Sequence, residues 1–103
     1  MAVIHVRDMK PGDTYIGRRV PRLGFFVDSP WANPFRIDEI YTREESIRWF
    51  EDWVRTSNAT EAVWCREHIG ELHGKRLACW CHPKPCHGQV LLQLLREAEI
   101  NGS

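Results

Sequence analysis

Residues 76–99 constrain the fold of this chain more than any other segment. Arg76 to Cys81 has the pattern of a strand with no polar face, because its alternating residues are Leu77, Cys79 and Cys81 on one side and Ala78 and Trp80 on the other. Such a strand is typical of the centre of a sheet that is covered on both sides. A helix over about His87 to Glu99, apolar around most of its circumference, follows almost directly. In open α/β sheets, ligands bind where a strand ends and the next helix begins.

Two further strands and a long loop are expected in the first third of the chain. Val3 to Val6 reads as a short buried strand. Tyr15 to Val20 reads as a second strand, or a strand end, interrupted by Gly17. Prolines disfavour regular structure between Pro21 and Pro34. This loop region is too apolar for a linker, and we expect it to fold over the domain surface with its aromatic side chains as anchors: Phe25, Phe26, Trp31 and Phe35.

Two helices are expected in the middle of the chain. Residues from Thr42 to Arg55 place apolar side chains on one side of a helix and charged side chains on the other. Thr42 followed by Glu45 is the capping-box signature of a helix start. A second helix should begin near residues 58–60 and end near residues 70–74. Its apolar spacing predicts that Cys65 faces the core.

These elements predict one domain. The chain has 103 residues, of which 43% are hydrophobic and five are tryptophan, so it can bury a core of its own. We expect a single α/β domain over residues 1–103, with an ordered core of about 3–98. The expected architecture is a small three-layer domain with a short, mainly parallel sheet flanked by helices, and the site should form at the carboxyl edge of that sheet.

Charge and targeting signals narrow the function classes only slightly. Fourteen basic residues balance fourteen acidic ones, so any contact with an anionic partner must come from a local patch. No apolar stretch approaches the roughly 20 residues of a membrane span, and the amino terminus has no secretory signal pattern. We therefore expect a cytoplasmic protein that does not act at a membrane. Its cysteines should be reduced there, which favours metal binding or reactivity over a disulfide framework.

Residues 79–88 hold three of the four cysteines and two of the five histidines, and three interpretations of this cluster stay open. A helix amino terminus lowers the pKa of a nearby thiol, which makes Cys86 the first candidate for a reactive thiol and Cys81 the second. His87 would then be a proton donor or acceptor beside them. Alternatively, zinc takes four nitrogen and sulfur ligands from the cluster, the candidates being Cys79, Cys81, Cys86 and His82. In the third interpretation the cysteines are small buried apolar residues.

Known motifs remove several kinds of chemistry. A phosphatase-type loop needs an arginine six residues after its cysteine, but that position holds His87 after Cys81 and Leu92 after Cys86. The Cys-x-x-Cys spacing of thioredoxin-like redox sites is absent. Walker, dinucleotide-binding and nucleophile-elbow motifs are absent as well.

A second group of candidate binding residues surrounds Gly17. Arg18 and Arg19 follow it, and a glycine beside two guanidinium groups suits close binding of phosphate or carboxylate. Arg7 and Arg36 are further candidates from neighbouring strand and loop ends. We extend the expected ligand site to include Tyr15, Trp31 and Asn33, although an asparagine before proline is also an ordinary turn residue. The alternative for the arginines is a solvated basic turn.

Read in order, these motifs resemble one family. The chain is similar to domain of unknown function 4326 in four places. These are Tyr-Ile-Gly-Arg from Tyr15, Ser-Pro-Trp-Ala-Asn-Pro-Phe from Ser29, Gly74-Lys75, and the segment from Leu77 to Gly88 with its Cys-Trp-Cys and Cys-His-Gly. The resemblance covers roughly Val3 to Leu95 and implies a small α/β domain of bacteria or phages. The cysteine segment is also similar to domain of unknown function 488, but this chain has Gly88 where that family has arginine, which puts a shared anion-binding role in doubt.

Two functions are compatible with these patterns. The first is a small enzyme that acts on a nucleotide, a nucleic-acid component or another anionic ligand at the carboxyl edge of the sheet. The second is a non-catalytic binding module, with or without a structural zinc, that recognises a partner through Trp31 and the Phe25-Phe26 loop.

Overall fold

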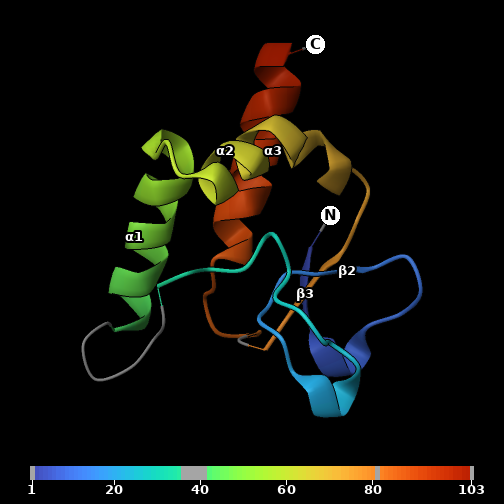
Figure 1. Cartoon of the computed structure of the whole chain (residues 1–103). Coiled ribbons are helices and arrows are strands. Elements are labelled where there is room, and N and C mark those ends of the chain that lie inside the picture. Colours follow the sequence, from blue (N-terminus) through green and yellow to red (C-terminus); the bar gives the residue numbers. More distant parts are fainter. Residues whose placement is uncertain (1, 36–41, 81, 103) are drawn as a thin grey trace.

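The computed structural model describes residues 2–35, 42–80 and 82–102, which form a small α/β domain (Figure 1). Within these residues the strands are β1 (Val3–His5), β2 (Thr14–Tyr15) and β3 (Leu77–Cys79). The α-helices are α1 (Arg43–Thr56), α2 (Thr60–His68) and α3 (Gly88–Gly102). Short 3-10 helices follow β1, β2 and α2, namely η1 (Val6–Asp8), η2 (Pro21–Leu23) and η3 (Ile69–Leu72). The α/β class expected from the sequence is confirmed.

The sheet is parallel and has β3 at its centre. The strand order is β1-β3-β2, with Val3 and Thr14 both in register with Leu77. All three residues of β3 are buried, as predicted from the absence of a polar face. Because the three strands run in the same direction, their carboxyl ends meet at one edge of the sheet.

The strands are shorter than the sequence patterns indicated. β2 ends at Tyr15, and Val20 returns only to form a single antiparallel bridge with Phe25. The backbone leaves the sheet because it turns at Gly17 and then enters η2 at Pro21, whose ring cannot donate a ladder hydrogen bond. The part of the predicted third strand at Cys81 lies outside the described residues.

The helices pack together beside the sheet. α1 begins with the predicted capping box, in which Thr42 and Glu45 each bond the backbone of the other. Figure 1 shows the three helices grouped together, and α1 contacts both α2 and α3. Arg55 on α1 donates two hydrogen bonds to the Glu97 carboxylate on α3, at 2.8 and 3.0 Å. This paired contact fixes α3 against α1.

The core lies between the helices and the sheet. Fully buried side chains from α1, β3, α3 and the residue after β2 meet there, including Ile16, Phe50, Leu77, Leu91 and Leu95. Cys65 on α2 is buried as predicted, and its Sγ donates to the Pro30 carbonyl oxygen at 3.4 Å. Burial raises the pKa of the Cys65 thiol to about 11, so the thiol stays protonated.

The loop over residues 21–35, called the aromatic loop below, is anchored by some of its aromatic side chains. Trp31 is 4% exposed and packs edge-to-face against Trp64, with ring centroids 4.9 Å apart. Phe25 stacks on Tyr15, whereas Phe26 is 72% exposed. None of the described helices is both long and apolar enough to cross a membrane.

Candidate functional site

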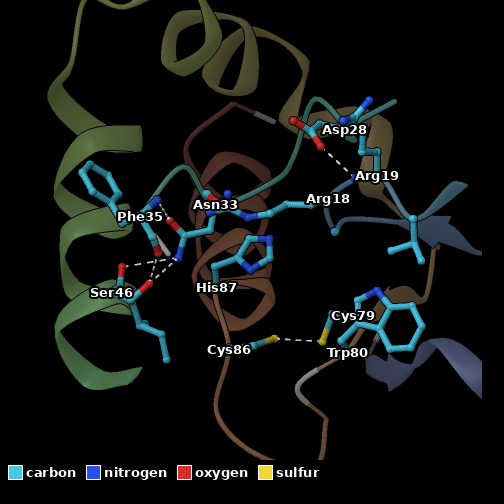
Figure 2. Close-up of a pocket in the computed structure, with 13 residues that line it drawn as sticks. Arg18, Arg19, Asp28, Asn33, Phe35, Ser46, Cys79, Trp80, Cys86 and His87 are labelled. Carbon is cyan, nitrogen blue, oxygen red and sulfur yellow. Dashed lines mark hydrogen bonds between the residues drawn. The ribbon is translucent and has the colours of Figure 1, made fainter. Parts of the chain in front are cut away.

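A cleft of about 540 Å³ opens at the carboxyl ends of β2 and β3 (Figure 2). Four parts of the chain line it: the turn after β2, the aromatic loop, the first turns of α1, and the two ends of the cysteine segment. The lining residues are Gly17, Arg18, Arg19, Val20, Asp28, Asn33, Phe35, Ser46, Ile47, Cys79, Trp80, Cys86 and His87. The structure therefore brings seven of the sequence-predicted site residues into one cleft: Gly17, Arg18, Arg19, Asn33, Cys79, Cys86 and His87.

The two arginines enter the cleft in different ways. The Arg18 side chain is partly buried, and its Nη2 donates to the Asn33 carbonyl oxygen at 2.5 Å. Arg19 is exposed, and its backbone N–H donates to Asp28 Oδ1 at 2.7 Å. Arg18 therefore helps to position the loop, while the Arg19 guanidinium stands at the rim of the cleft. Together, the side chains of Arg18, Arg19 and Asp28 carry one net positive charge.

Tyr15 supports the wall of the cleft from behind. Its hydroxyl donates to the Arg18 carbonyl oxygen at 2.5 Å and accepts from Trp80 Nε1 at 2.8 Å. Its ring folds back over Gly17, where an added Cβ would lie only 2.5 Å from the Tyr15 hydroxyl. Partial burial raises the pKa of Tyr15, although the Trp80 N–H opposes this. The glycine is thus required by the tyrosine ring, and Tyr15 itself is not among the residues that line the cleft.

Asn33 joins the loop to α1. Its Oδ1 accepts from the Phe35 N–H at 2.8 Å, and its Nδ2 donates to Ser46 Oγ at 2.9 Å. The Ser46 hydroxyl in turn donates to the Phe35 carbonyl oxygen. The sequence analysis missed Ser46, which is fully buried. A serine four residues before Phe50, on the apolar face of the helix, was the available signal, because a buried hydroxyl needs a partner.

The remaining predicted ligand residues lie elsewhere. Trp31 is in the core and does not line the cleft. Arg36 and Cys81 lie outside the described residues. His82 is exposed, and it precedes Pro83 through a cis peptide bond. Among the residues that the structure describes, no group of three or more His, Cys, Asp or Glu side chains is arranged to hold a metal ion.

The entrance of α3 places Cys86 and His87 in the wall of the cleft. The Leu91 N–H donates to the His87 carbonyl oxygen at 3.2 Å, which is the first bond of the helix. The Gly88 N–H donates to Cys86 Sγ at 3.3 Å. The sulfur therefore satisfies a helix-terminal donor, and the positive end of the helix acts on that sulfur.

Gly88 is fixed by packing. An added Cβ would lie 2.8 Å from Ile16 Cδ1 and 3.0 Å from Val3 Cγ2. Neither atom can move freely, because both belong to side chains packed between the sheet and α3. A larger residue, including the arginine of the second family that the motif resembles, does not fit here without a shift of the helix.

The His87 ring is buried. Its Nε2 lies 2.9 Å from the Ile16 carbonyl oxygen, and its ring packs edge-to-face on Phe50. Burial lowers the pKa of His87 to about 4, against the opposing effect of the Ile16 and Trp31 backbone and with a small contribution from nearby Arg18. The imidazole is thus neutral near neutral pH, with one ring nitrogen bonded to Ile16, the residue after β2. Its role in proton transfer stays a prediction.

Two thiols meet in the wall of the cleft. Cys79, the last residue of β3, and Cys86, just before α3, are each 2% exposed, and their sulfur atoms are 3.2 Å apart. A spacing of seven residues does not predict this contact. It arises because the end of β3 and the start of α3 both lie at the cleft, where Figure 2 shows the two side chains in contact.

The fold and the cleft define a class: a small parallel α/β domain with a partly basic cleft, walled by thiols, at the carboxyl edge of its sheet. Comparison with protein families matches residues 4–97 to a domain of unknown function (DUF4326). The chain belongs to this family, which confirms the resemblance in its motifs.

Two curated relatives come from viruses. The chain is 36% identical over 55 residues to an uncharacterised 12.4 kDa protein from the nrdA-td intergenic region of enterobacteria phage T4, a match that covers 52% of this chain and 49% of that protein. It is 31% identical over 96 residues to an uncharacterised protein of Acanthamoeba polyphaga mimivirus, covering 84% of this chain and 69% of that one. The chain thus spans about half the length of the phage protein. No solved structure matches the chain.

Proposed function

We propose that this protein is a small enzyme that acts on a nucleotide or a related phosphate-bearing ligand in the cleft. The observation that carries the proposal is the convergence of three chemistries at one sheet edge: the Arg18-Arg19 pair, the exposed indole of Trp80 and the thiol of Cys86. Arginines recognise phosphate oxygens through charge-assisted hydrogen bonds, and an indole offers a face on which a base can stack.

Arg19 is the main anion contact in this proposal. Its guanidinium lies at the rim, and Asp28 holds its backbone in place through the N–H. The Asp28 carboxylate also repels a second negative charge, which favours a ligand with one phosphate group over a polyphosphate. Arg18 contributes a second guanidinium while it remains bonded to the loop.

Trp80 supplies the aromatic contact. The side chain is 40% exposed, although its Nε1 is bonded to Tyr15 and its ring meets the edge of His5 with centroids 5.9 Å apart. These contacts fix the orientation of the indole before a ligand arrives, which reduces the entropy lost on binding. A cleft of about 540 Å³ is within the size range of small-molecule sites.

Cys86 is the group that we assign to chemistry. Its sulfur accepts the Gly88 N–H at the positive end of α3, and this contact stabilises negative charge on the sulfur against the opposing effect of its burial. The neutral His87 positions this segment through its bond to Ile16. Cys81, a further candidate, belongs to the same segment.

Thermal unfolding in the presence of defined ligands tests the proposal. We expect a nucleoside 5′-monophosphate to raise the melting temperature more than inorganic phosphate, ribose 5-phosphate or the free nucleoside do. Product analysis of the same nucleotides, with Cys86→Ser as the comparison, tests turnover. No stabilisation by any phosphate-bearing ligand would refute binding, and turnover that survives in Cys86→Ser would refute the assigned nucleophile.

A second candidate function is a non-catalytic binding module with a structural zinc. The contact between Cys79 and Cys86 favours it, since two thiolates on one tetrahedral zinc lie roughly 3.8 Å apart at a zinc–sulfur distance of about 2.3 Å. The exposed Phe26 of the aromatic loop would then contribute to partner recognition. Elemental analysis of purified protein distinguishes the two functions: one zinc per chain whose chelation unfolds the domain supports the module, and metal-free folded protein refutes it.

A further inference from the structure

We propose that Cys79 and Cys86 form a reversible disulfide bond that turns the cleft into a redox-sensitive site. Their sulfur atoms are already 3.2 Å apart, whereas the sulfurs of a disulfide are about 2.0 Å apart. Forming the bond therefore needs an approach of roughly 1 Å and only the two atoms that are already in contact. The proposal concerns the thiols alone and does not depend on the identity of the cleft ligand.

The positions of the two residues make such an approach feasible. Cys79 is the last residue of β3, and Cys86 precedes α3, so both sulfurs belong to residues at the ends of these elements and not inside them. Both sulfurs belong to residues that line the cleft, as Figure 2 shows, and a small oxidant can reach them through it. Cys65, in contrast, is buried on α2 and is not among the residues that line the cleft.

The two thiols have different roles in the reaction. The Gly88 N–H donates to Cys86 Sγ, so negative charge is better tolerated on Cys86, which makes Cys86 the attacking thiolate. It attacks an oxygen of a hydroperoxide, breaks the O–O bond and becomes a sulfenic acid, while the other oxygen leaves as an alcohol or water after taking a proton. Cys79 then attacks the Cys86 sulfur, the S–S bond forms and the sulfenic oxygen leaves as water.

The two reaction steps balance in atoms and electrons. Two thiols are oxidised by two electrons, one hydroperoxide is reduced to one alcohol and one water, and a dithiol reductant reverses the change. Disulfide formation consumes the Cys86 thiol in the wall of the cleft. Chemistry that depends on that thiolate would therefore stop in the oxidised form and return on reduction.

The test uses the full chain with Cys81→Ser, which leaves Cys65, Cys79 and Cys86 as its only cysteines. The folded variant is treated with hydrogen peroxide, the peroxide is removed with catalase, and the protein is unfolded and alkylated with iodoacetamide. We expect intact mass spectrometry to show the loss of two hydrogen atoms and a single alkylated residue, Cys65. Treatment with dithiothreitol before alkylation should restore three alkylated residues.

Adding Cys79→Ser to the same variant is the matched control, and it should lose no hydrogen pair. Wild type supplies a second measurement in case Cys81→Ser fails to fold, because chymotrypsin cleaves after Trp80 and separates Cys79 from the later cysteines. Peroxide should then produce a Cys79 peptide linked to one containing Cys86, with fragmentation assigning the bond. Three results would each overturn the proposal. They are full alkylation of both thiols after peroxide, sulfinic acid without a disulfide, and one zinc per chain that shields both thiols from peroxide.

Discussion

Acid should destabilise this domain through one residue, His87, before its carboxylates begin to titrate. Burial holds the pKa of His87 near 4 in the folded state, against a usual value of 6.5 in the unfolded chain. Above about pH 6.5 the residue is neutral in both states and stability is fully present. As the pH falls through the interval between the two values, the unfolded chain takes up a proton that the folded chain does not, so the free energy of unfolding falls.

The size of the effect follows from the two pKa values. Each unit of difference is worth about 1.4 kcal/mol, so the full loss is about 3 kcal/mol once the pH reaches the folded-state value. Between about pH 7 and pH 5 the expected loss is about 2 kcal/mol. A domain of this size is stable by only about 5–15 kcal/mol, so this loss should be easy to measure.

Urea unfolding at a series of pH values measures it, with His87→Gln as the comparison. The variant should be less stable near neutral pH, because it loses the ring packing on Phe50, but its stability should change much less over the same interval. The other histidines are present in both proteins, so their contributions cancel in the difference. Equal slopes in the wild type and in the variant would show that His87 is not held neutral by burial.

Three further substitutions or reactions test the packing and the thiols. Gly88→Ala should lower the free energy of unfolding by about 1–2 kcal/mol, because overpacking against Ile16 outweighs a gain of up to about 1 kcal/mol in helix propensity. If the variant is as stable as wild type in urea, the close approach of Ile16 to Gly88 is contradicted. Cys65→Ser should cost roughly 1–3 kcal/mol and leave ligand binding intact, and loss of binding at unchanged stability would contradict its structural role. Iodoacetamide at neutral pH should label Cys86 faster than Cys65 in the native protein, and equally slow labelling of both, mapped by mass spectrometry, would count against a reactive thiol.

The order of the main helices and strands, and the edge of the sheet at which the cleft lies, could be predicted from the sequence. A strand without a polar face, ending at Cys79, has to be central, and a helix that follows it directly has to cover the sheet, which sets the edge where the cleft forms. The capping box at Thr42 and the burial of Cys65 followed from local pattern alone. These features depend on residues close together in the chain.

Contacts between distant segments were not predictable in the same way. Asn33 and Trp31 were natural candidates for ligand binding, yet the Asn33 amide bonds Ser46 on α1, and Trp31 is buried against Trp64. Whether a polar or aromatic loop residue faces a ligand or another segment depends on where the loop lies, which periodicity does not specify. The same is true of the contact between Cys79 and Cys86.

Isothermal titration calorimetry of a nucleoside 5′-monophosphate into wild type, Arg19→Ala and Arg22→Ala tests the central claim most directly. Arg22 is the matched control, since it is an exposed arginine in η2 that is not among the residues lining the cleft. We expect Arg19→Ala to weaken Kd by about tenfold or more, the loss of a charge-assisted hydrogen bond of about 1.5–3 kcal/mol, and Arg22→Ala to leave it nearly unchanged. Equal weakening by both variants, or no binding by the wild type, would contradict a phosphate-binding cleft at the carboxyl edge of this sheet.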